Sequence, residues 1–184
     1  MFDFEKKKKL RQRYTRVRES INNRKQKELL INQKLYDYLS EKKKCLGAYF
    51  PTKSEVNIKP SLKKLQNDGN DISLPVIVEK NKSLVFKLWI KNQRLIKGEF
   101  NIHIPDNKII IHPNFLLVPL LAFNNQKYRL GYGGGFYDRT IAAFNNVDFF
   151  SLGIAFDEQE TDIFFSEKHD KKLNAILTPT RLIE

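Results

Sequence analysis

The feature that most constrains the fold of this 184-residue chain is the stretch 129–139, RLGYGGGFYDR. Four of the five positions 131–135 are glycine, with only Tyr132 between them. A glycine costs roughly 0.5–1 kcal/mol in the interior of a helix or strand, because its backbone loses the most freedom on folding. The stretch is therefore expected to be a loop whose backbone takes positive φ angles or lies close to a bound group.

A phosphate would suit such a loop. Glycines let backbone N–H groups converge on an anion, and a helix predicted to begin at Phe136 would add the positive end of its dipole. Arg129 and Arg139 can neutralise phosphate charge, and Asp138 can bind Mg²⁺, which proteins hold with one or two carboxylates plus substrate phosphates. These residues make a phosphate site the favoured interpretation.

The two common phosphate motifs do not describe this loop. A P-loop needs Lys followed by Ser or Thr after the glycines, and neither pair is present. The dinucleotide fingerprint needs a last glycine where this chain has Phe136, and a strand that runs directly into the loop, which we do not expect here. A tight structural turn remains the alternative to a phosphate site.

Helical periodicity alternates with buried, strand-like runs along the chain. Residues 115–118, FLLV, are apolar throughout, as in strands covered on both faces. The alternation predicts one domain, residues 1–184, with three α/β/α layers around a mainly parallel, Rossmann-like sheet. No regular element is assigned to 91–112. The predicted helices are 4–21, 25–39, 59–65 and 136–146, and the predicted strands are 45–50, 72–79, 84–90, 115–118, 149–156 and 175–177.

The N-terminal segment is strongly basic. Residues 1–44 hold 15 Lys or Arg against 6 Asp or Glu, a net charge of +9 out of +12 for the chain. Coulomb attraction does not distinguish nucleic acid, an anionic surface and a polyanionic small molecule, so all three stay open. The inward side chains are expected to be Leu10, Tyr14, Val17 and Ile21 in the first helix and Leu29, Leu35 and Leu39 in the second.

Cysteine content and hydropathy indicate the compartment. Cys45 is the single cysteine, which excludes an internal disulfide and a thiolate zinc cluster; its apolar setting predicts a buried structural thiol. No apolar run approaches the roughly 18 residues of a membrane span, and no signal-peptide pattern follows the lysine-rich start. We therefore expect a cytoplasmic protein without a membrane partner.

The stretch RLGYGGGFYDR closely resembles the signature of the 5-formyltetrahydrofolate cyclo-ligase (5,10-methenyltetrahydrofolate synthetase) family. The similarity extends over nearly the whole chain, in order and spacing. Its other motifs are KKKLR (7–11), YFPTKSE (49–55), LVPLLAF (117–123), LGIAFDEQ (152–159) and the pair His169 and Asp170 before 176–178.

The resemblance implies an enzyme that converts 5-formyltetrahydrofolate and ATP, with Mg²⁺, into 5,10-methenyltetrahydrofolate, ADP and phosphate. In this chemistry ATP phosphorylates the formyl oxygen, and nitrogen 10 then closes the ring as phosphate leaves. The protein has mainly to position two substrates and spread phosphoryl charge, without a covalent nucleophile. It also implies a monomer that takes folate with or without a polyglutamate tail and binds no specific nucleic acid.

Individual roles follow from the same resemblance. Arg129 and Tyr137 are the implied catalytic residues, Asp138 and Asp170 the Mg²⁺ ligands, and His169 orients the loop of Asp170. The implied ATP-binding residues are Lys7, Lys8, Lys9, Leu10, Arg11, Arg129, Leu130, Gly131, Tyr132, Gly133, Gly134, Gly135, Phe136 and Tyr137. The implied folate-binding residues are Phe50, which packs on the flat ring, Glu55, which accepts hydrogen bonds from the pterin, and Tyr132, Gly133, Gly134 and Gly135.

Some positions depart from the family pattern, and two other functions stay open. Ile104, Leu120 and Asn124 stand where many relatives have Glu, Gly and Asp, and Gly134 stands where some have Lys. One alternative is a nucleic-acid-binding protein that uses residues 6–27 as a basic helix, with an affinity that falls steeply with salt. The other is a relative that binds folate without turnover.

Overall fold

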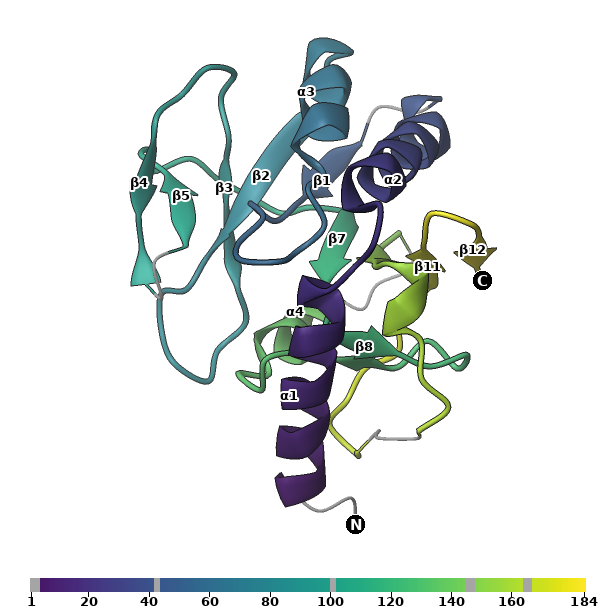
Figure 1. The fold of residues 1–184 in the computed structure, drawn as a ribbon. Helices are drawn as coiled ribbons and strands as arrows, with labels where there is room; N and C mark the ends of the chain where they lie inside the picture. The colour runs from purple at the N-terminus through teal and green to yellow at the C-terminus, as the bar shows by residue number, and fades with distance from the viewer. Residues whose placement is uncertain (1–3, 42–43, 100–101, 145–147, 164–166) are drawn as a thin grey trace.

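The computed structural model describes residues 4–41, 44–99, 102–144, 148–163 and 167–184 (Figure 1). Its centre is an eight-stranded sheet. The strands are β1 (Cys45–Gly47), β2 (Asp71–Val76), β3 (Val85–Leu88), β6 (Ile110–Ile111), β7 (Phe115–Pro119), β10 (Phe150–Ile154), β11 (Ala175–Leu177) and β12 (Leu182–Ile183). Their order across the sheet is β12-β11-β10-β7-β1-β2-β3-β6.

The five inner strands of this sheet, from β11 to β2, run parallel to one another. The antiparallel strands β12, β3 and β6 lie at its two edges. Successive side chains of a strand point to opposite faces, so in β7 Phe115 and Leu117 join one core while Leu116 and Val118 join the other. The prediction of a mainly parallel sheet with doubly buried strands is confirmed.

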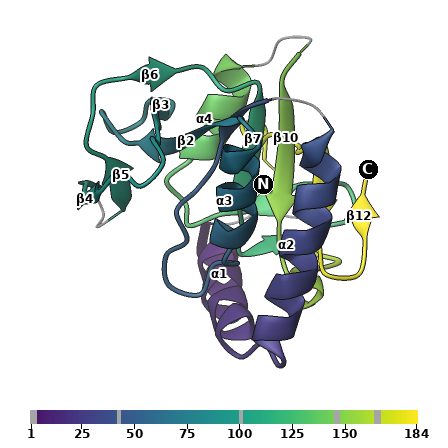
Figure 2. The ribbon, with the colours of Figure 1, turned by 90° about the horizontal axis from the view of Figure 1, so that it is seen from above.

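Helices cover both faces of the sheet (Figure 2). On one face, α2 (Arg24–Ser40) and α3 (Lys59–Asn67) pack Leu35 and Leu62 into the core that contains Leu117. On the other face, α4 (Phe136–Ala143) places Ile141 in the core that contains Leu116. The predicted three-layer α/β/α arrangement is therefore confirmed.

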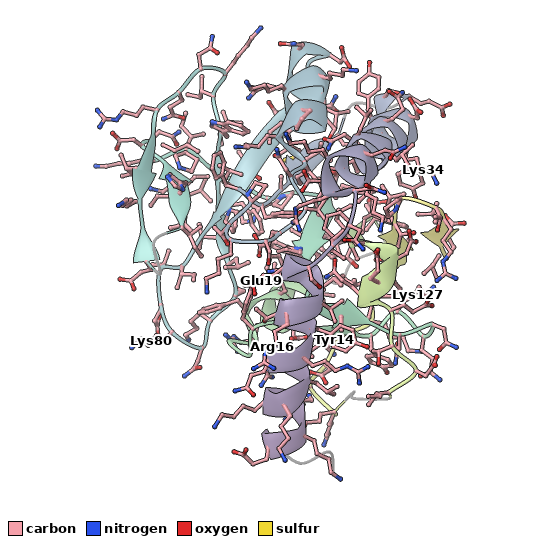
Figure 3. The ribbon with its side chains drawn as sticks, viewed as in Figure 1. Tyr14, Arg16, Glu19, Lys34, Lys80 and Lys127 are labelled. Atoms are coloured by element: carbon pink, nitrogen blue, oxygen red, sulfur yellow. The ribbon has the colours of Figure 1, made fainter. Side chains whose placement is uncertain are left out.

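The helix α1 (Phe4–Glu19) lies outside these layers, beyond the carboxyl end of β7 (Figure 1). Its apolar stripe, Leu10 and Tyr14, packs against Leu121, Ala122 and Leu130 around a hairpin of β8 (Ala122–Phe123) and β9 (Arg129–Leu130). Tyr14 belongs to α1 and is labelled in Figure 3. Its hydroxyl donates to the carbonyl of Glu160 at 3.2 Å, beside the 3₁₀ helix η2 (Asp157–Gln159). None of the helices in the described ranges is long and apolar enough to cross a membrane.

Several predicted boundaries are wrong at the N-terminal end. The first helix ends at Glu19, and a turn with Asn23 at φ 51° separates it from α2, so residues 6–27 do not form one helix. Leu29 is 70% exposed, because the buried stripe of α2 follows Ile31, Leu35 and Leu39 at intervals of four. Strand β1 ends at Gly47, three residues earlier than predicted.

Other differences concern short elements. The region predicted to be irregular contains β4 (Leu95–Lys97), β5 (His103–Pro105) and β6, strands too short to give a readable period. Helix α4 ends at Ala143, and residues 145 and 146 of its predicted extent lie outside the described ranges. Strand β9 runs directly into the glycine loop, contrary to expectation. Cys45 is half-buried rather than buried, and partial burial raises the pKa of its thiol, which disfavours a nucleophilic thiolate.

Candidate active site

The strand order reverses between β1 and β7. From β1 the chain continues to β2 on one side, whereas from β7 it continues to β10 and β11 on the other. Connections diverge at such a switch point, which leaves a crevice at the carboxyl ends of the strands. A cavity of about 1840 Å³ occupies this position, lined by Tyr49 and Phe50 after β1 and by Pro119 at the end of β7. It exceeds the roughly 300–1,000 Å³ of a typical small-molecule pocket, so it has room for two ligands.

The glycine loop forms one wall of this cavity. The predicted positive φ angles are found at Gly133 (+99°) and Gly135 (+64°), and Gly135 is the N-cap of α4. A side chain at Gly134 would have its Cβ 2.9 Å from the Phe136 ring, whereas one at Gly131 would meet nothing within 4 Å. Two glycines thus set the loop's conformation, one permits a close contact, and one leaves open space beside the cavity.

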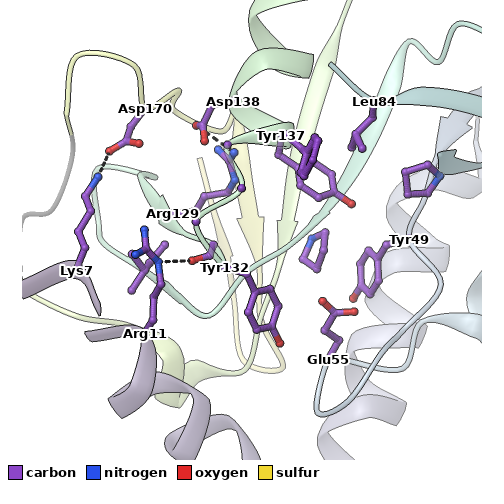
Figure 4. Close-up of a pocket in the computed structure, with 18 of the residues that line it drawn as sticks. Lys7, Arg11, Tyr49, Glu55, Leu84, Arg129, Tyr132, Tyr137, Asp138 and Asp170 are labelled. Atoms are coloured by element: carbon purple, nitrogen blue, oxygen red, sulfur yellow. Dashed lines mark hydrogen bonds and ion pairs between the residues drawn. The ribbon is translucent and has the colours of Figure 1, made fainter. Parts of the chain in front are cut away.

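Helix α1 presents three cations to the cavity, Lys6, Lys7 and Arg11, and the last two lie one turn apart on the helix (Figure 4). Lys7 is only 7% exposed, and its Nζ lies 2.8 Å from Asp170 Oδ2 and 3.3 Å from Glu167 Oε2. The Nε of Arg11 donates to the carbonyl of Gly131 at 3.0 Å. Lys8, Lys9 and Leu10 were also predicted to bind ATP, but they do not line the cavity. Lys8 and Lys9 are exposed, and Leu10 is in the apolar cluster beneath α1.

Arg129 and Asp138 form an ion pair at the same wall, with 3.0 Å between the guanidinium and Oδ1. Arg129 also donates to the carbonyl of Lys171 at 3.1 Å, and the backbone N–H of Lys171 donates to Asp138 Oδ1 at 2.9 Å. These bonds hold the segment that carries Asp170 against the start of α4. The two predicted metal ligands therefore line one cavity from adjacent segments.

The donor set at this wall fits Mg²⁺. Among the residues that the structure describes, no three or more His, Cys, Asp or Glu side chains gather into a group that could hold a metal on their own. Asp138 and Asp170 supply two hard carboxylates, and Mg²⁺ is usually bound by one or two of these together with substrate phosphates. The arrangement suits a metal that arrives with a phosphorylated ligand.

The opposite wall carries Glu55 and Phe50. Glu55 is 9% exposed and accepts hydrogen bonds from the Thr52 N–H at 2.9 Å and the Thr52 hydroxyl at 3.2 Å. Burial raises the pKa of the Glu55 carboxyl, although the hydrogen bonds and the charge of Arg18 oppose that shift. The Phe50 ring meets Trp89 edge-on at 6.1 Å and lies 5.1 Å from His103.

Between the two walls lies Tyr137 (Figure 4). Burial raises the pKa of its phenol, so the hydroxyl is neutral at physiological pH and can donate a hydrogen bond. Tyr132 lines the cavity with its side chain 51% exposed. Leu130, Phe136 and His169 line it as well, whereas His112 packs edge-on against Phe144.

The departures from the family pattern lie in different places. Leu120 is buried in the apolar core, and the side chain of Asn124 accepts hydrogen bonds from Gln126 and Tyr128 within the β8–β9 turn. Ile104 pairs with Ile96 in the β4–β5 hairpin. None of the three lines the cavity described here.

Sequence reasoning missed several residues of the site. Pro75 and Ile77 line the cavity because they lie at the carboxyl end of β2. The strand predicted for this segment could have indicated them. Leu84 reaches it from the β2–β3 connection, which no motif marked. Arg18 is buried behind the wall, and the basic composition of α1 gave no means to separate it from its exposed neighbours.

Comparisons with known proteins agree with this geometry. The family model of the 5-formyltetrahydrofolate cyclo-ligase family matches residues 3–179. The 5-formyltetrahydrofolate cyclo-ligase of Haemophilus influenzae is 28% identical over 159 residues, which cover 83% of this chain and 85% of the relative. That of Mycoplasma genitalium is 31% identical over 153 residues, 80% of this chain and 81% of the relative.

A solved structure shares the fold. The 5,10-methenyltetrahydrofolate synthetase of Mycoplasma pneumoniae superposes with a TM-score of 0.75 at 25% identity, covering 94% of this chain and 98% of that one. The match therefore covers nearly the whole chain rather than one motif. The chain belongs to the 5-formyltetrahydrofolate cyclo-ligase family.

Proposed function

We propose that this protein converts 5-formyltetrahydrofolate and ATP into 5,10-methenyltetrahydrofolate, ADP and phosphate. The observation that carries the proposal is a single cavity, about 1840 Å³ in volume, with cations and a glycine loop on one wall and Glu55 and Phe50 on the other. A reaction between a polyanion and a flat heterocycle needs both walls in one enclosure. Family membership supplies the identity of the heterocycle.

The wall that carries the glycine loop, Lys7, Arg11 and Arg129, called here the phosphate wall, is proposed to bind ATP. Backbone N–H groups before α4 and the positive end of that helix attract anions. Lys7 and Arg11 add charge from α1, and Arg129 adds charge from the loop itself. Lys8 and Lys9 are exposed outside this wall, so we assign the phosphate contacts of the basic cluster to Lys7 and Arg11.

The opposite wall, with Glu55 and Phe50, is called here the folate wall and is proposed to bind the folate. The Glu55 carboxylate can accept hydrogen bonds from the amino and ring N–H groups of the pterin, and Phe50 offers an apolar surface for its flat ring. Tyr132, between the glycines, faces the space where the two ligands would meet (Figure 4). A polyglutamate tail on the folate would add negative charge near a basic helix, so we include tailed folates among the substrates.

The proposed chemistry makes the formyl oxygen a leaving group. The γ-phosphoryl group moves to that oxygen as its bond to ADP breaks. Nitrogen 10 then attacks the formyl carbon and loses its proton, while the carbon–oxygen bond breaks and phosphate departs. Arg129 is proposed to stabilise negative charge on the transferred group, and Tyr137 to donate a hydrogen bond beside it and exclude water.

Asp138 and Asp170 are proposed to hold Mg²⁺, which would offset the charge of the ATP phosphates. Each carboxylate is now paired with a cation, Asp138 with Arg129 and Asp170 with Lys7. Binding of the metal would give both carboxylates a new partner and leave both cations for the phosphates. The ion pairs thus neutralise these two carboxylates until the ligands arrive.

We also propose that the protein acts as a cytoplasmic monomer. One chain supplies both walls of the cavity, and ATP and reduced folates are intracellular metabolites. A nucleic-acid function is less well supported. The basic residues Lys7, Arg11 and Arg18 of α1 contact the rest of the protein, and the helix ends at Glu19.

The test is a spectroscopic assay with purified protein, 5-formyltetrahydrofolate, ATP and Mg²⁺. We expect the ultraviolet band of the methenyl product to grow with time, and to stay absent without ATP or with a non-hydrolysable ATP analogue. Folded protein that binds the folate but forms no band would instead be a relative without turnover. Binding to duplex DNA or RNA, titrated with salt, would test the nucleic-acid alternative separately.

A further inference from the structure

Arg18 is the largest fully buried side chain that carries a charge, with 1% of its surface exposed. It comes from the last turn of α1 and joins three separate segments. Its Nε donates to Ser54 Oγ at 3.1 Å, and one terminal nitrogen donates to the carbonyl of Leu120 at 3.0 Å. The other terminal nitrogen donates to the hydroxyl of Tyr132.

Burial of a guanidinium that has no carboxylate partner is energetically unfavourable. No Asp or Glu oxygen of the described residues lies within 4.0 Å of Arg18. Burial of a charge costs several kcal/mol unless hydrogen bonds replace the lost water, and an apolar side chain would close the same space at lower cost. What only an arginine supplies here is a rigid fork that bonds three partners at once.

All three partners of Arg18 belong to the wall of the cavity or adjoin it. Tyr132 lines the cavity, Ser54 lies between two lining residues, and Leu120 follows the lining residue Pro119. Arg18 itself does not line the cavity. Its bonds therefore fix the relative positions of the turn that carries Glu55 and the glycine loop.

Tyr132 is the partner that most needs such a bond. It lies between Gly131 and Gly133 in a loop with few side chains to hold it, and half of its own surface is exposed. Its ring has the Arg18 guanidinium at 5.5 Å and the Lys53 ammonium also at 5.5 Å. Figure 4 shows this ring between Arg11 of the phosphate wall and Glu55 of the folate wall.

We propose that Arg18 is a positioning residue that acts through Tyr132: it holds the ring where the two walls meet, so that the formyl oxygen and the γ-phosphate are aligned. The inference rests on the proposed function. Reactions between two bound substrates depend on such alignment, and a misplacement of about 1 Å can lower the rate by about 100-fold. Loss of Arg18 should therefore lower kcat far more than it raises the KM for ATP.

The test is a double-mutant cycle of Arg18→Met and Tyr132→Phe, measured as kcat and KM with each substrate. Tyr132→Phe keeps the ring and removes only the acceptor. We expect each single variant to lose about 10-fold or more in kcat, with the KM for ATP within about threefold of wild type, and the double variant to lose no more than the worse single variant. Arg18→Lys, with a single nitrogen in place of the fork, should recover only part of kcat.

Arg24→Met is the matched control. Arg24 also binds the turn of Ser54 and Glu55 through their carbonyls, but no bond joins it to Tyr132 in the described structure. Its effect on kcat should combine additively with that of Tyr132→Phe. Non-additivity of that pair, or additivity of Arg18→Met with Tyr132→Phe, would overturn the proposal.

Two further outcomes decide between the inference and the function on which it rests. If Arg18→Met does not fold, Tyr132→Phe alone decides, because a kcat equal to that of wild type overturns the role of the bond. If folded wild-type protein shows no turnover, the proposed function fails and the inference falls with it. An active wild type with unchanged variants overturns the role of Arg18 alone.

Discussion

The ammonium group of Lys7 lies 2.8 Å from the carboxylate of Asp170, across 163 positions of sequence. The pair joins the first helix to the segment that precedes β11, and both side chains line the cavity. A cation proposed for ATP and a carboxylate proposed for Mg²⁺ thus neutralise each other. The pair makes the contribution of each residue measurable by a substitution that removes its charge.

Lys7→Met should raise the KM for ATP by about 10- to 100-fold, the worth of one hydrogen bond to a charged group. The variant loses a phosphate contact and leaves Asp170 and Glu167 to repel the nucleotide. Lys8→Met is the matched comparison, since Lys8 is exposed and lies 3.8 Å from Glu5 rather than in the cavity. Steady-state kinetics at saturating folate would measure both, and equal effects at the two positions would contradict the assignment.

Asp138→Asn should raise the Mg²⁺ concentration that gives half-maximal turnover by about 10-fold or more, as expected when a hard carboxylate ligand is lost. The Asn oxygen can still accept the Lys171 N–H, so the local backbone should stay in place. Chelation by EDTA should abolish wild-type turnover, and added Mg²⁺ should restore it. Asp106→Asn, at an exposed position outside the cavity, serves as the control; an Mg²⁺ dependence unchanged by Asp138→Asn would count against this ligand.

Gly135→Ala should lower the free energy of unfolding by about 1–2 kcal/mol, because its φ of +64° is left-handed and an L side chain is strained there. Gly131→Ala, four positions earlier in the same loop, should change stability by less than about 0.5 kcal/mol, since its Cβ would enter open space. Urea unfolding of the two variants makes the comparison. Similar losses at both positions would show that backbone conformation is not what Gly135 provides.

Glu55→Gln should stabilise the fold at neutral pH while it impairs folate use. Burial raises the pKa of Glu55 above its ordinary value of 4.5, so the folded protein binds this proton more tightly than the unfolded chain. Stability is then lost as the pH rises from about 4.5 through the raised pKa, and Gln avoids that loss. The gain in unfolding free energy should therefore be complete at pH values above the raised pKa of Glu55, and it should vanish at pH values below the ordinary pKa.

The kinetic half of the same prediction concerns the folate. Since Gln cannot offer two anionic acceptors, kcat/KM for 5-formyltetrahydrofolate should fall by about 10- to 100-fold. In wild type, kcat/KM for the folate should fall as the pH drops through the raised pKa of Glu55. Glu79→Gln, at an exposed position, is the control for general charge effects. A Glu55→Gln variant with wild-type folate kinetics would remove this residue from the site.

The fold was largely predictable because the buried strands can be recognised by their apolar composition. Residues 115–118 are apolar at every position, and the structure buries all four in two separate cores. Short strands escaped prediction, since β4 and β6 have three and two residues and gain their conformation from pairing with partners elsewhere in the chain. Leu29 was misplaced because three leucines in α2 fit a plausible stripe, and only packing selects Ile31 instead.

The residues of the site were predictable where a sequence motif marks them, but not where packing alone determines which side chains reach the cavity. The glycine loop with Asp138 stood out by composition, and the structure brings it to the cavity. The direction of the lysines did not follow from the run KKKLR, in which Lys7 turns inward and Lys8 and Lys9 outward. That direction depends on how α1 is rotated on the β8–β9 hairpin, a contact between residues more than 100 positions apart.

The position of α1 also bears on the order of folding. Helix α1 has its partners in the β8–β9 hairpin and the glycine loop, as in the bond between Arg11 and Gly131, 120 residues later. Contacts of such long sequence separation form late, because closing a long loop costs entropy before the contact rewards it. During synthesis on the ribosome, strands β1, β2, β3, β6 and β7 of the main sheet emerge before the β8–β9 hairpin on which the apolar stripe of this basic helix packs. The cavity is therefore among the last parts of the molecule to be completed.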